Sequence, residues 1–200
     1  KLTKNMNTIK KPLFAIITLG ILTLTLLSAC SKDPLYRPDS NMPQELKEQH
    51  ETALEEKLTI LEENLNDGDA RPQTAFHYQM LGDYSNAIKY YKWTLEYDPT
   101  HVVSLNNLAD IYETVVEDYE TAAEYIKKLY TLKPDDKEAI SDTVRILLKA
   151  GNPTNADEAL QNYKKLVINS ENPDPAQKEF IKSLKDQINN FMNARNAIKK

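Results

Sequence analysis

The chain has 200 residues, of which 30 are acidic and 25 are basic, and its formal net charge is −5. This acidic composition disfavours nucleic-acid binding, because neutralising phosphates requires clustered Lys and Arg. The single cysteine excludes an internal disulfide, so packing must hold the fold together, and the length is sufficient for one domain with its own core.

The first 30 residues combine a basic segment, an apolar run, two small residues and the cysteine. Residues 6–11 carry positive charge, residues 13–27 carry none, and Ser28-Ala29-Cys30 follows. This order resembles the signal peptide and lipobox of bacterial lipoproteins. The resemblance implies cleavage after Ala29 and attachment of diacylglycerol to the Cys30 thiol. We therefore predict a signal peptide over 1–29, in which 1–5 precede the start if Met6 is the initiator.

Two alternatives to a lipoprotein signal are an uncleaved membrane helix and an incidental cysteine after an ordinary signal peptide. The apolar run is shorter than the ~20 residues that a spanning helix needs. Lys10 and Lys11 would stay on the cytoplasmic side, so we expect everything after Cys30 to lie outside the cytoplasm, anchored in the bacterial cell envelope. In a cell with two membranes, Ser31 favours the outer membrane facing the periplasm, because the resemblance implies inner-membrane retention by an aspartate at this position.

Residues 30–42 contain two prolines and no apolar periodicity, which predicts an extended lipidated tether without stable structure. Residues 43–67 then form an amphipathic pattern that ends at Asn66-Asp67-Gly68. We expect a capping helix or a partial repeat here. A short coiled-coil dimer is the alternative, although the segment has fewer than the ~3–4 heptads that a coiled coil needs. The apolar positions are Leu46, Leu54, Leu58, Leu61 and Leu65.

An internal repeat follows. The segment from Gly82-Asp83-Tyr84 through Ala87 to Pro99 recurs as Asp118-Tyr119 through Ala122 to Pro134, with a spacing of 35 residues. A looser third copy opens at Lys149-Ala150-Gly151 and continues through Ala159 and Tyr163. This pattern resembles the tetratricopeptide repeat, whose period is ~34 residues. The extra residue fits the turn around Val116 and Glu117. The chain departs from the family pattern because no tryptophan opens a repeat, and Ala75, Ala109 or Val144 replaces the glycine of the first helix.

The resemblance implies an all-α fold in which about three helical hairpins, over residues 68–173, stack as a right-handed α-solenoid. Alanine at positions 87, 122 and 159 would let two antiparallel helices approach closely. Pro99 and Pro134 would end hairpins, and Asp83 or Asp135 would accept the free amides where the next helix begins. Residues 174–200 complete the array as a second capping helix, with an apolar face formed by Phe180, Leu184, Ile188, Phe191 and Met192.

The sequence shows no pattern typical of catalysis. His50, His77 and His101 are far apart and lack metal-ligand spacing, so we predict surface or seam histidines and no metal or cofactor. Four scattered glycines exclude a phosphate loop, and no nucleophile motif surrounds a serine. We therefore expect that the protein is not an enzyme. One charge run is predicted to cover a solvated helix face: Glu113, Glu117, Asp118, Glu120 and Glu124.

The remaining function is binding. The tetratricopeptide resemblance implies a concave groove lined by the first helix of each hairpin. Chaperone-type members use a basic clamp there, and only Asn107 fits that pattern, so we expect an extended segment of a protein partner instead. Two classes stay open: a scaffold for envelope or outer-membrane assembly, and an adaptor that recruits a cell-wall or protein-processing enzyme. For Phe76 the alternative is packing beneath the amino-terminal helix. The predicted groove residues are Phe76, Gln79, Asn106, Asp110, Glu113, Arg145 and Lys149.

Overall fold

The structure is a computed structural model that describes residues 33–168 and 174–198. Cys30 and the proposed signal peptide lie outside these residues. The described part is built from helices, and none of them has the length and hydropathy to cross a membrane. The elements are α2 (Gln44–Glu63), α3 (Ala70–Met80), α4 (Tyr84–Tyr97), α5 (Val102–Ile111), η1 (Tyr112–Val116), α6 (Tyr119–Leu132), α7 (Lys137–Lys149), α8 (Pro153–Val167) and α9 (Pro175–Ile198).

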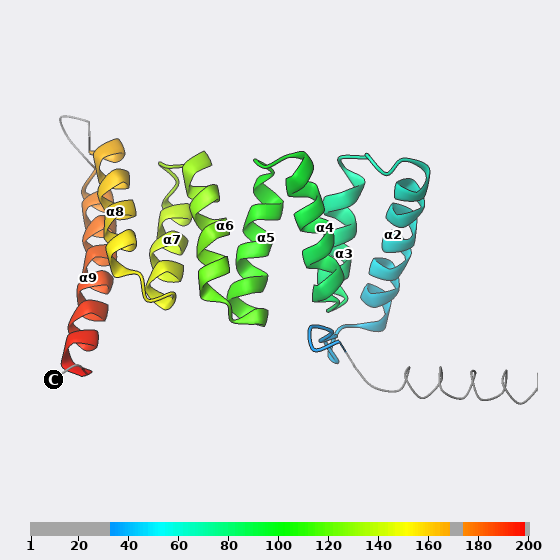
Figure 1. The fold of residues 1–200 in the computed structure, drawn as a ribbon, viewed down its shortest axis with the longest axis horizontal. Coiled ribbons are helices and arrows are strands. Elements are labelled where there is room, and N and C mark those ends of the chain that lie inside the picture. The colour runs from blue at the N-terminus through cyan, green and yellow to red at the C-terminus, as the bar shows by residue number, and fades with distance from the viewer. Residues whose placement is uncertain (1–32, 169–173, 199–200) are drawn as a thin grey trace, which may run out of the picture.

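The helices run alternately up and down, and the hairpins that they form follow one another in a row along the long axis of the molecule (Figure 1). The pairs α3–α4, α5–α6 and α7–α8 form three hairpins, with α2 at one end of the row and α9 at the other. Each helix packs mainly against its neighbours in sequence, which is the contact pattern of a helical-repeat solenoid. The predicted all-α hairpin array is confirmed.

The seam of each hairpin contains the predicted small residue. Ala87 and Ala122 are fully buried and Ala159 nearly so. Four residues after Ala87 and Ala159, buried Tyr91 and Tyr163 lie on the same helix faces as the alanines. The missing side-chain volume of alanine brings the paired helices together, and the larger residue one turn later fills the seam.

The hairpin ends follow local capping chemistry. Asp83 accepts a hydrogen bond from the Asn86 amide and so caps α4. Asp136 caps α7, accepting from the amides of Glu138 and Ala139 at 2.8 and 3.1 Å, so the assignment of this role to Asp135 was wrong. The reason is register: α7 begins at Lys137, and the residue immediately before the first helical position is the one placed to cap.

The extra residue of the second repeat lies where the sequence places it. Residues Tyr112–Val116 widen into one π-helical turn, and Glu117 follows with a left-handed φ of 61°. Gly82 and Gly151 occupy the corresponding turns of the other hairpins, with φ values of 76° and 73°. The second repeat therefore makes this turn with a residue that has a side chain.

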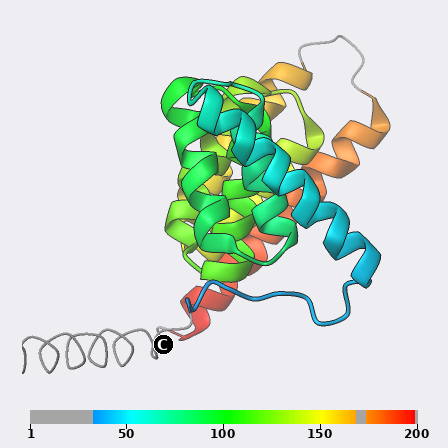
Figure 2. The same cartoon turned by 90° about the vertical axis from the view of Figure 1, so that its right-hand side faces the viewer.

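The two end helices are less deeply packed than the hairpins. In α2, which crosses the end of the row obliquely (Figure 2), only Leu61 is buried. This helix ends at Glu63, before the predicted stop at Asn66-Asp67-Gly68, and Leu65 beyond it is 62% exposed. In α9, Leu184 and Ile188 are buried as part of the predicted apolar face, whereas Met192 is 45% exposed.

The segment before α2 has a defined structure where it meets the first hairpin. Tyr36 forms an isolated antiparallel bridge with Asp83, in the turn between α3 and α4. The expectation of a tether without stable structure is therefore wrong for this stretch. Its backbone forms hydrogen bonds with the turn. Such backbone contacts do not depend on side-chain periodicity, so the apolar pattern could not predict them.

Candidate functional site

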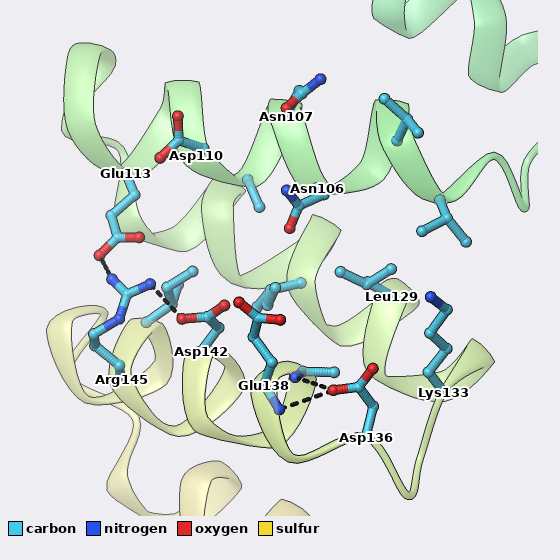
Figure 3. A pocket seen from close by; sticks show the side chains of 16 residues that line it. Asn106, Asn107, Asp110, Glu113, Leu129, Lys133, Asp136, Glu138, Asp142 and Arg145 are labelled. Atoms are coloured by element: carbon cyan, nitrogen blue, oxygen red, sulfur yellow. Dashed lines mark hydrogen bonds and ion pairs between the residues drawn. The ribbon is translucent and has the colours of Figure 1, made fainter.

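A polar groove of about 450 Å³ opens between α5 and α7 (Figure 3). Its walls come from the first helices of the second and third hairpins, and α6 lies behind them. The lining residues are Val102, Val103, Asn106, Asn107, Ala109, Asp110, Glu113, Ile126, Leu129, Lys133, Asp136, Glu138, Ala139, Asp142, Arg145 and Ile146.

Helical spacing explains why these side chains share one face. On α5, Asn106 and Asp110 are separated by four residues and are both exposed, so they stand one turn apart along the wall. On α7, Glu138 and Asp142 have the same separation. The α5 wall begins at His101, whose Nδ1 accepts from the Ser104 amide and fixes the first turn.

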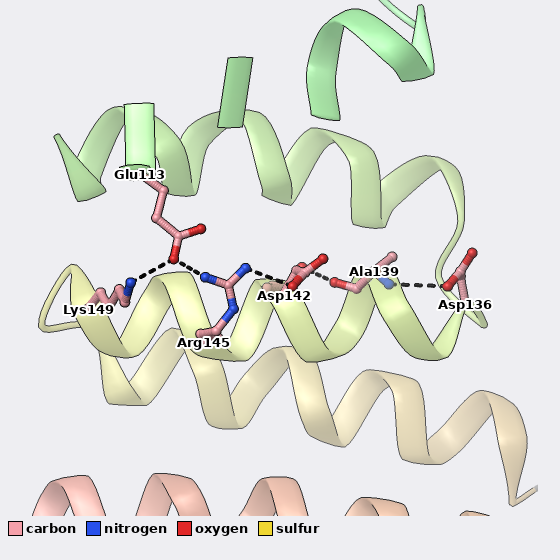
Figure 4. Close-up of polar contacts among 7 residues, drawn as sticks. Glu113, Asp136, Ala139, Asp142, Arg145 and Lys149 are labelled. Carbon is pink, nitrogen blue, oxygen red and sulfur yellow. Dashed lines mark hydrogen bonds and ion pairs between the residues drawn. The ribbon is translucent and has the colours of Figure 1, made fainter. Parts of the chain in front are cut away.

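One end of the groove is closed by an ion cluster around Glu113 (Figure 4). The Glu113 carboxylate accepts from Arg145 Nη1 and, at 2.9 Å, from Lys149 Nζ. Arg145 Nη2 also donates to Asp142 Oδ1 at 2.8 Å. This cluster joins the second hairpin to the third, and the positive charge of Arg145 is satisfied within the protein.

The burial of Glu113 differs from the solvated charge run that was predicted. Glu113 is only 4% exposed, whereas Glu117, Glu120 and Glu124 of the same run are exposed. Leu105 and Ala109, eight and four residues earlier, face the core, and the helical period places Glu113 on that same face. A buried carboxylate requires charged or hydrogen-bonding partners, and Arg145 and Lys149 provide them.

The groove is electrostatically negative beyond this cluster. Burial is the main cause that raises the pKa of Asp142, and the neighbouring charges of Glu138, Asp110 and Asp136 raise it further. Lys133 is the one lining cation that has no ion pair among the described residues. A positively charged group entering the groove would relieve the repulsion between these carboxylates.

The structure brings four of the predicted groove residues together and separates the other three. Asn106, Asp110, Glu113 and Arg145 line the groove, whereas Lys149 only joins the ion cluster. Gln79 lies in the seam of the first hairpin, where its Oε1 accepts from the Tyr91 hydroxyl.

Phe76 lies away from the groove, at the contact between α2 and α3. Its ring meets the edge of His50 on α2, with ring centroids 6.0 Å apart, and the residue is 41% exposed. His50 and His77 also meet here, with their Nδ1 atoms 3.1 Å apart. No sequence pattern indicates this pairing, because the two histidines are 27 residues apart along the chain. Among the described residues, no three His, Cys, Asp or Glu side chains form a cluster that could hold a metal ion.

Sequence reasoning missed the acidic wall on α7. Glu138 and Asp142 are not among the predicted groove residues, although their spacing of four residues places them on one helix face. Lys133 and Asp136 were also missed, and they belong to the turn between α6 and α7. The angle at which α6 and α7 cross determines whether this turn lines the groove, and the sequence pattern does not specify that angle.

Comparisons with known proteins agree with this architecture. The family model for the tetratricopeptide repeat matches residues 104–140, a range that includes most of the groove. The uncharacterized protein ycf37 of Pyropia yezoensis is 37% identical over 82 residues, which are 41% of this chain and 46% of that protein. The solved structure of the MamA RS-1 ArsTM double mutant is similar in fold, with a TM-score of 0.52 and 15% identity; the match covers 90% of this chain and 96% of that one.

Proposed function

Because the chain is a helical-repeat solenoid that contains a tetratricopeptide repeat, we propose that it is a lipid-anchored scaffold or adaptor that binds an extended segment of a protein partner. The observation that carries this proposal is the polar groove between α5 and α7. An extended segment crossing both first helices would touch Asn106 and Asp110 on one wall and Asp142 on the other. The amides and carboxylates there can bind the main chain of such a segment.

The charge of the groove specifies the chemistry of the segment. Arg145 is already paired with Glu113 and Asp142, so it is not available to a partner carboxylate. Asp110, Glu138 and Asp142 instead favour a Lys or Arg side chain, because their carboxylates make the groove negative. Such a cation would lower the pKa of Asp142, which burial and the neighbouring carboxylates raise. The proposed ligand is therefore an extended peptide with at least one basic residue.

The anchoring and location are part of the same proposal. The order of charge, apolar run, small residues and cysteine supports attachment of a lipid to Cys30 and residence in the bacterial cell envelope, outside the cytoplasm. In a cell with two membranes, the domain would stand on the outer membrane and face the periplasm. Replacing Cys30→Ala should leave a larger precursor without acyl label, and equal size and labelling of variant and parent would contradict this part.

Peptide binding by the groove can be tested with defined probes. Extended ten-residue peptides are compared with copies in which each Lys is replaced by Gln, and binding is measured by fluorescence polarisation. The double variant Asp110→Asn/Asp142→Asn keeps hydrogen-bonding side chains and should weaken binding of the Lys peptides by about tenfold, which corresponds to ~1.4 kcal/mol. Glu120→Gln/Glu124→Gln on the exposed face of α6 is the matched control and should not change it. Equal binding of Lys and Gln peptides would contradict the proposed charge preference.

A further inference from the structure

The segment that follows Cys30 is clipped to the turn between α3 and α4. The Arg37 amide donates to the Gly82 carbonyl at 2.7 Å, and the Tyr84 amide donates to the Leu35 carbonyl at 3.1 Å. These two hydrogen bonds flank the bridge between Tyr36 and Asp83. We call the paired residues 35–37 and 82–84 the clip.

Gly82 makes the clip possible in two ways. Its φ of 76° is a conformation that residues with a side chain rarely adopt. In addition, a Cβ on Gly82 would come within 2.3 Å of the Arg37 carbonyl oxygen and 2.7 Å of the Pro38 Cα. Gly151 has nearly the same φ in the turn of the third hairpin, yet a Cβ there would meet nothing within 4 Å. The close backbone approach is therefore a particular property of the first turn.

The clip lies at one edge of the row of helices. The turns after α3, η1 and α7 and the carboxy-terminal end of α9 all lie at this edge, which is the lower one in Figure 1. We call it the anchor edge. From Cys30 to Leu35 there are five residue steps, and at ~3.3–3.6 Å per residue the chain between them can span at most ~18 Å.

We propose that the clip holds the solenoid with its anchor edge toward a phospholipid surface, so that the row of helices runs along the membrane. This inference rests on the proposed lipidation of Cys30. A lipid at Cys30 brings the clipped turn within ~18 Å of the bilayer. Because the clip fixes the chain to the body of the first hairpin, the remaining hairpins keep the same edge toward the membrane.

The charge of the anchor edge does not by itself explain such an orientation. The turns at this edge contain Asp83, Glu117 and Asp118. Arg37 and Arg195 contact two of these turns through the Gly82 and Gly151 carbonyls, so the edge carries both signs and is not a basic surface that anionic lipids would attract. The clip, and not lipid charge, would set the orientation. A groove held in this way between α5 and α7 would receive a partner segment that runs parallel to the membrane.

The orientation can be measured on the full-length lipidated chain in phosphatidylcholine vesicles. One fluorophore is placed at Asn155→Cys, in the first turn of α8, which follows the α7 turn of the anchor edge. In a second protein it is placed at Thr131→Cys, in the last turn of α6 at the opposite edge, and both positions are exposed. Helix α6 has 14 residues and is therefore about 20 Å long, which separates the two edges. A quencher on the lipid headgroups should quench the label at position 155 several-fold more strongly than the label at 131.

Two variants release the clip. Gly82→Ala introduces the clashing Cβ, and Arg37→Pro removes the amide that donates to Gly82 while leaving the hairpin turn unchanged. Both should abolish the difference between the labels. The matched control Gly151→Ala strains an equivalent turn without a close neighbour and should preserve it. Substituting phosphatidylglycerol for part of the phosphatidylcholine should change nothing.

The outcomes separate this inference from the proposed function. Equal quenching of the two labels in the parent, or an unchanged difference in both clip variants, overturns the inference while lipidation and peptide binding stand. A chain that carries no acyl group and does not attach to vesicles overturns the proposed anchoring, and the inference with it. A difference that is lost in the clip variants and kept in the control supports the inference.

Discussion

The Nδ2 group of Asn107 donates a hydrogen bond to the Tyr91 hydroxyl at 2.7 Å, across the boundary between the first two hairpins. The same hydroxyl donates to Gln79 Oε1 at 2.9 Å. Tyr91 is fully buried, and burial raises the pKa of its phenol well above the usual value. Three polar side chains from α3, α4 and α5 thus satisfy one another where the first two hairpins meet, with the Tyr91 ring buried and the two amides half-buried.

These two hydrogen bonds of the Tyr91 hydroxyl, which we call the relay, predict that Tyr91 and Tyr163 respond differently to the loss of the hydroxyl. Tyr91→Phe removes the hydroxyl and leaves the half-buried amides of Gln79 and Asn107 without that partner, so the free energy of unfolding should fall by about 0.5–1.5 kcal/mol. Tyr163 occupies the same position in the third hairpin, but its buried hydroxyl has no hydrogen-bond partner within residues 33–168 and 174–198. Tyr163→Phe should therefore be neutral or slightly stabilising. Urea unfolding of both variants checks this, and equal losses would show that the relay does not stabilise the fold.

The hairpin register predicts the effect of overpacking the seam. Ala122 is fully buried where α6 crosses its neighbours, so Ala122→Phe should destabilise the domain by about 1–3 kcal/mol. Glu120 is exposed on the same helix, and Glu120→Ala should change stability little. Thermal melts of a soluble domain from Asn41 onward give the comparison. Two melting temperatures that match the parent would contradict the register.

The sequence was sufficient for the fold because the hairpin signals are local. Buried Ala87 and Ala122, the capping Asp83, and the helix ends before Pro99 and Pro134 each reflect chemistry within one or two turns of chain. The site was predictable only in part. The positions of Asn106 and Asp110 on one wall follow from helix periodicity. Its opposite wall depends on how α7 crosses the second hairpin.

The features that sequence analysis missed are contacts between distant segments. The clip requires Arg37 to reach Gly82, and the histidine pair requires α2 to lie across α3. No residue spacing predicts either contact, because both depend on where the amino-terminal segment and α2 pack against the hairpins. The buried Glu113 is an intermediate case. Helix periodicity predicts the face on which it lies, but Arg145 and Lys149, which compensate the cost of burying its charge, belong to the next hairpin.

The left-handed turn of the second repeat offers a stabilising substitution. Glu117 has a φ of 61°, a conformation that costs a residue with a side chain roughly 1–2 kcal/mol. Glu117→Gly removes this cost but increases the entropy of the unfolded chain, so a net gain of about 0.5–1 kcal/mol is expected. The reverse change at the equivalent position, Gly151→Ala, should be destabilising. A Glu117→Gly variant that unfolds more easily than the parent would contradict this reading of the turn.

The histidine pair predicts a loss of stability in mild acid. Burial is the main cause that lowers the pKa of His77 below its ordinary 6.5; His50 and Lys57 lower it further, and Glu56 opposes them. Between 6.5 and this lower value the unfolded chain binds more protons than the folded one, so the free energy of unfolding falls as the pH falls. His77→Gln should flatten this dependence just below pH 6.5. The measurement is urea unfolding at several pH values, and an identical slope in variant and parent would exclude His77 as the cause.

The most direct test of the proposed function is photo-crosslinking from inside and outside the groove in living cells. A benzophenone amino acid replaces Asn106 on the groove wall, or, as the control, Glu124 on the exposed face of α6. Position 106 should give a discrete protein adduct that is lost in the Asp110→Asn/Asp142→Asn background, while position 124 should not give it. Adducts that form only from position 124, or that persist unchanged in the double variant, would show that the partner binds elsewhere on the protein.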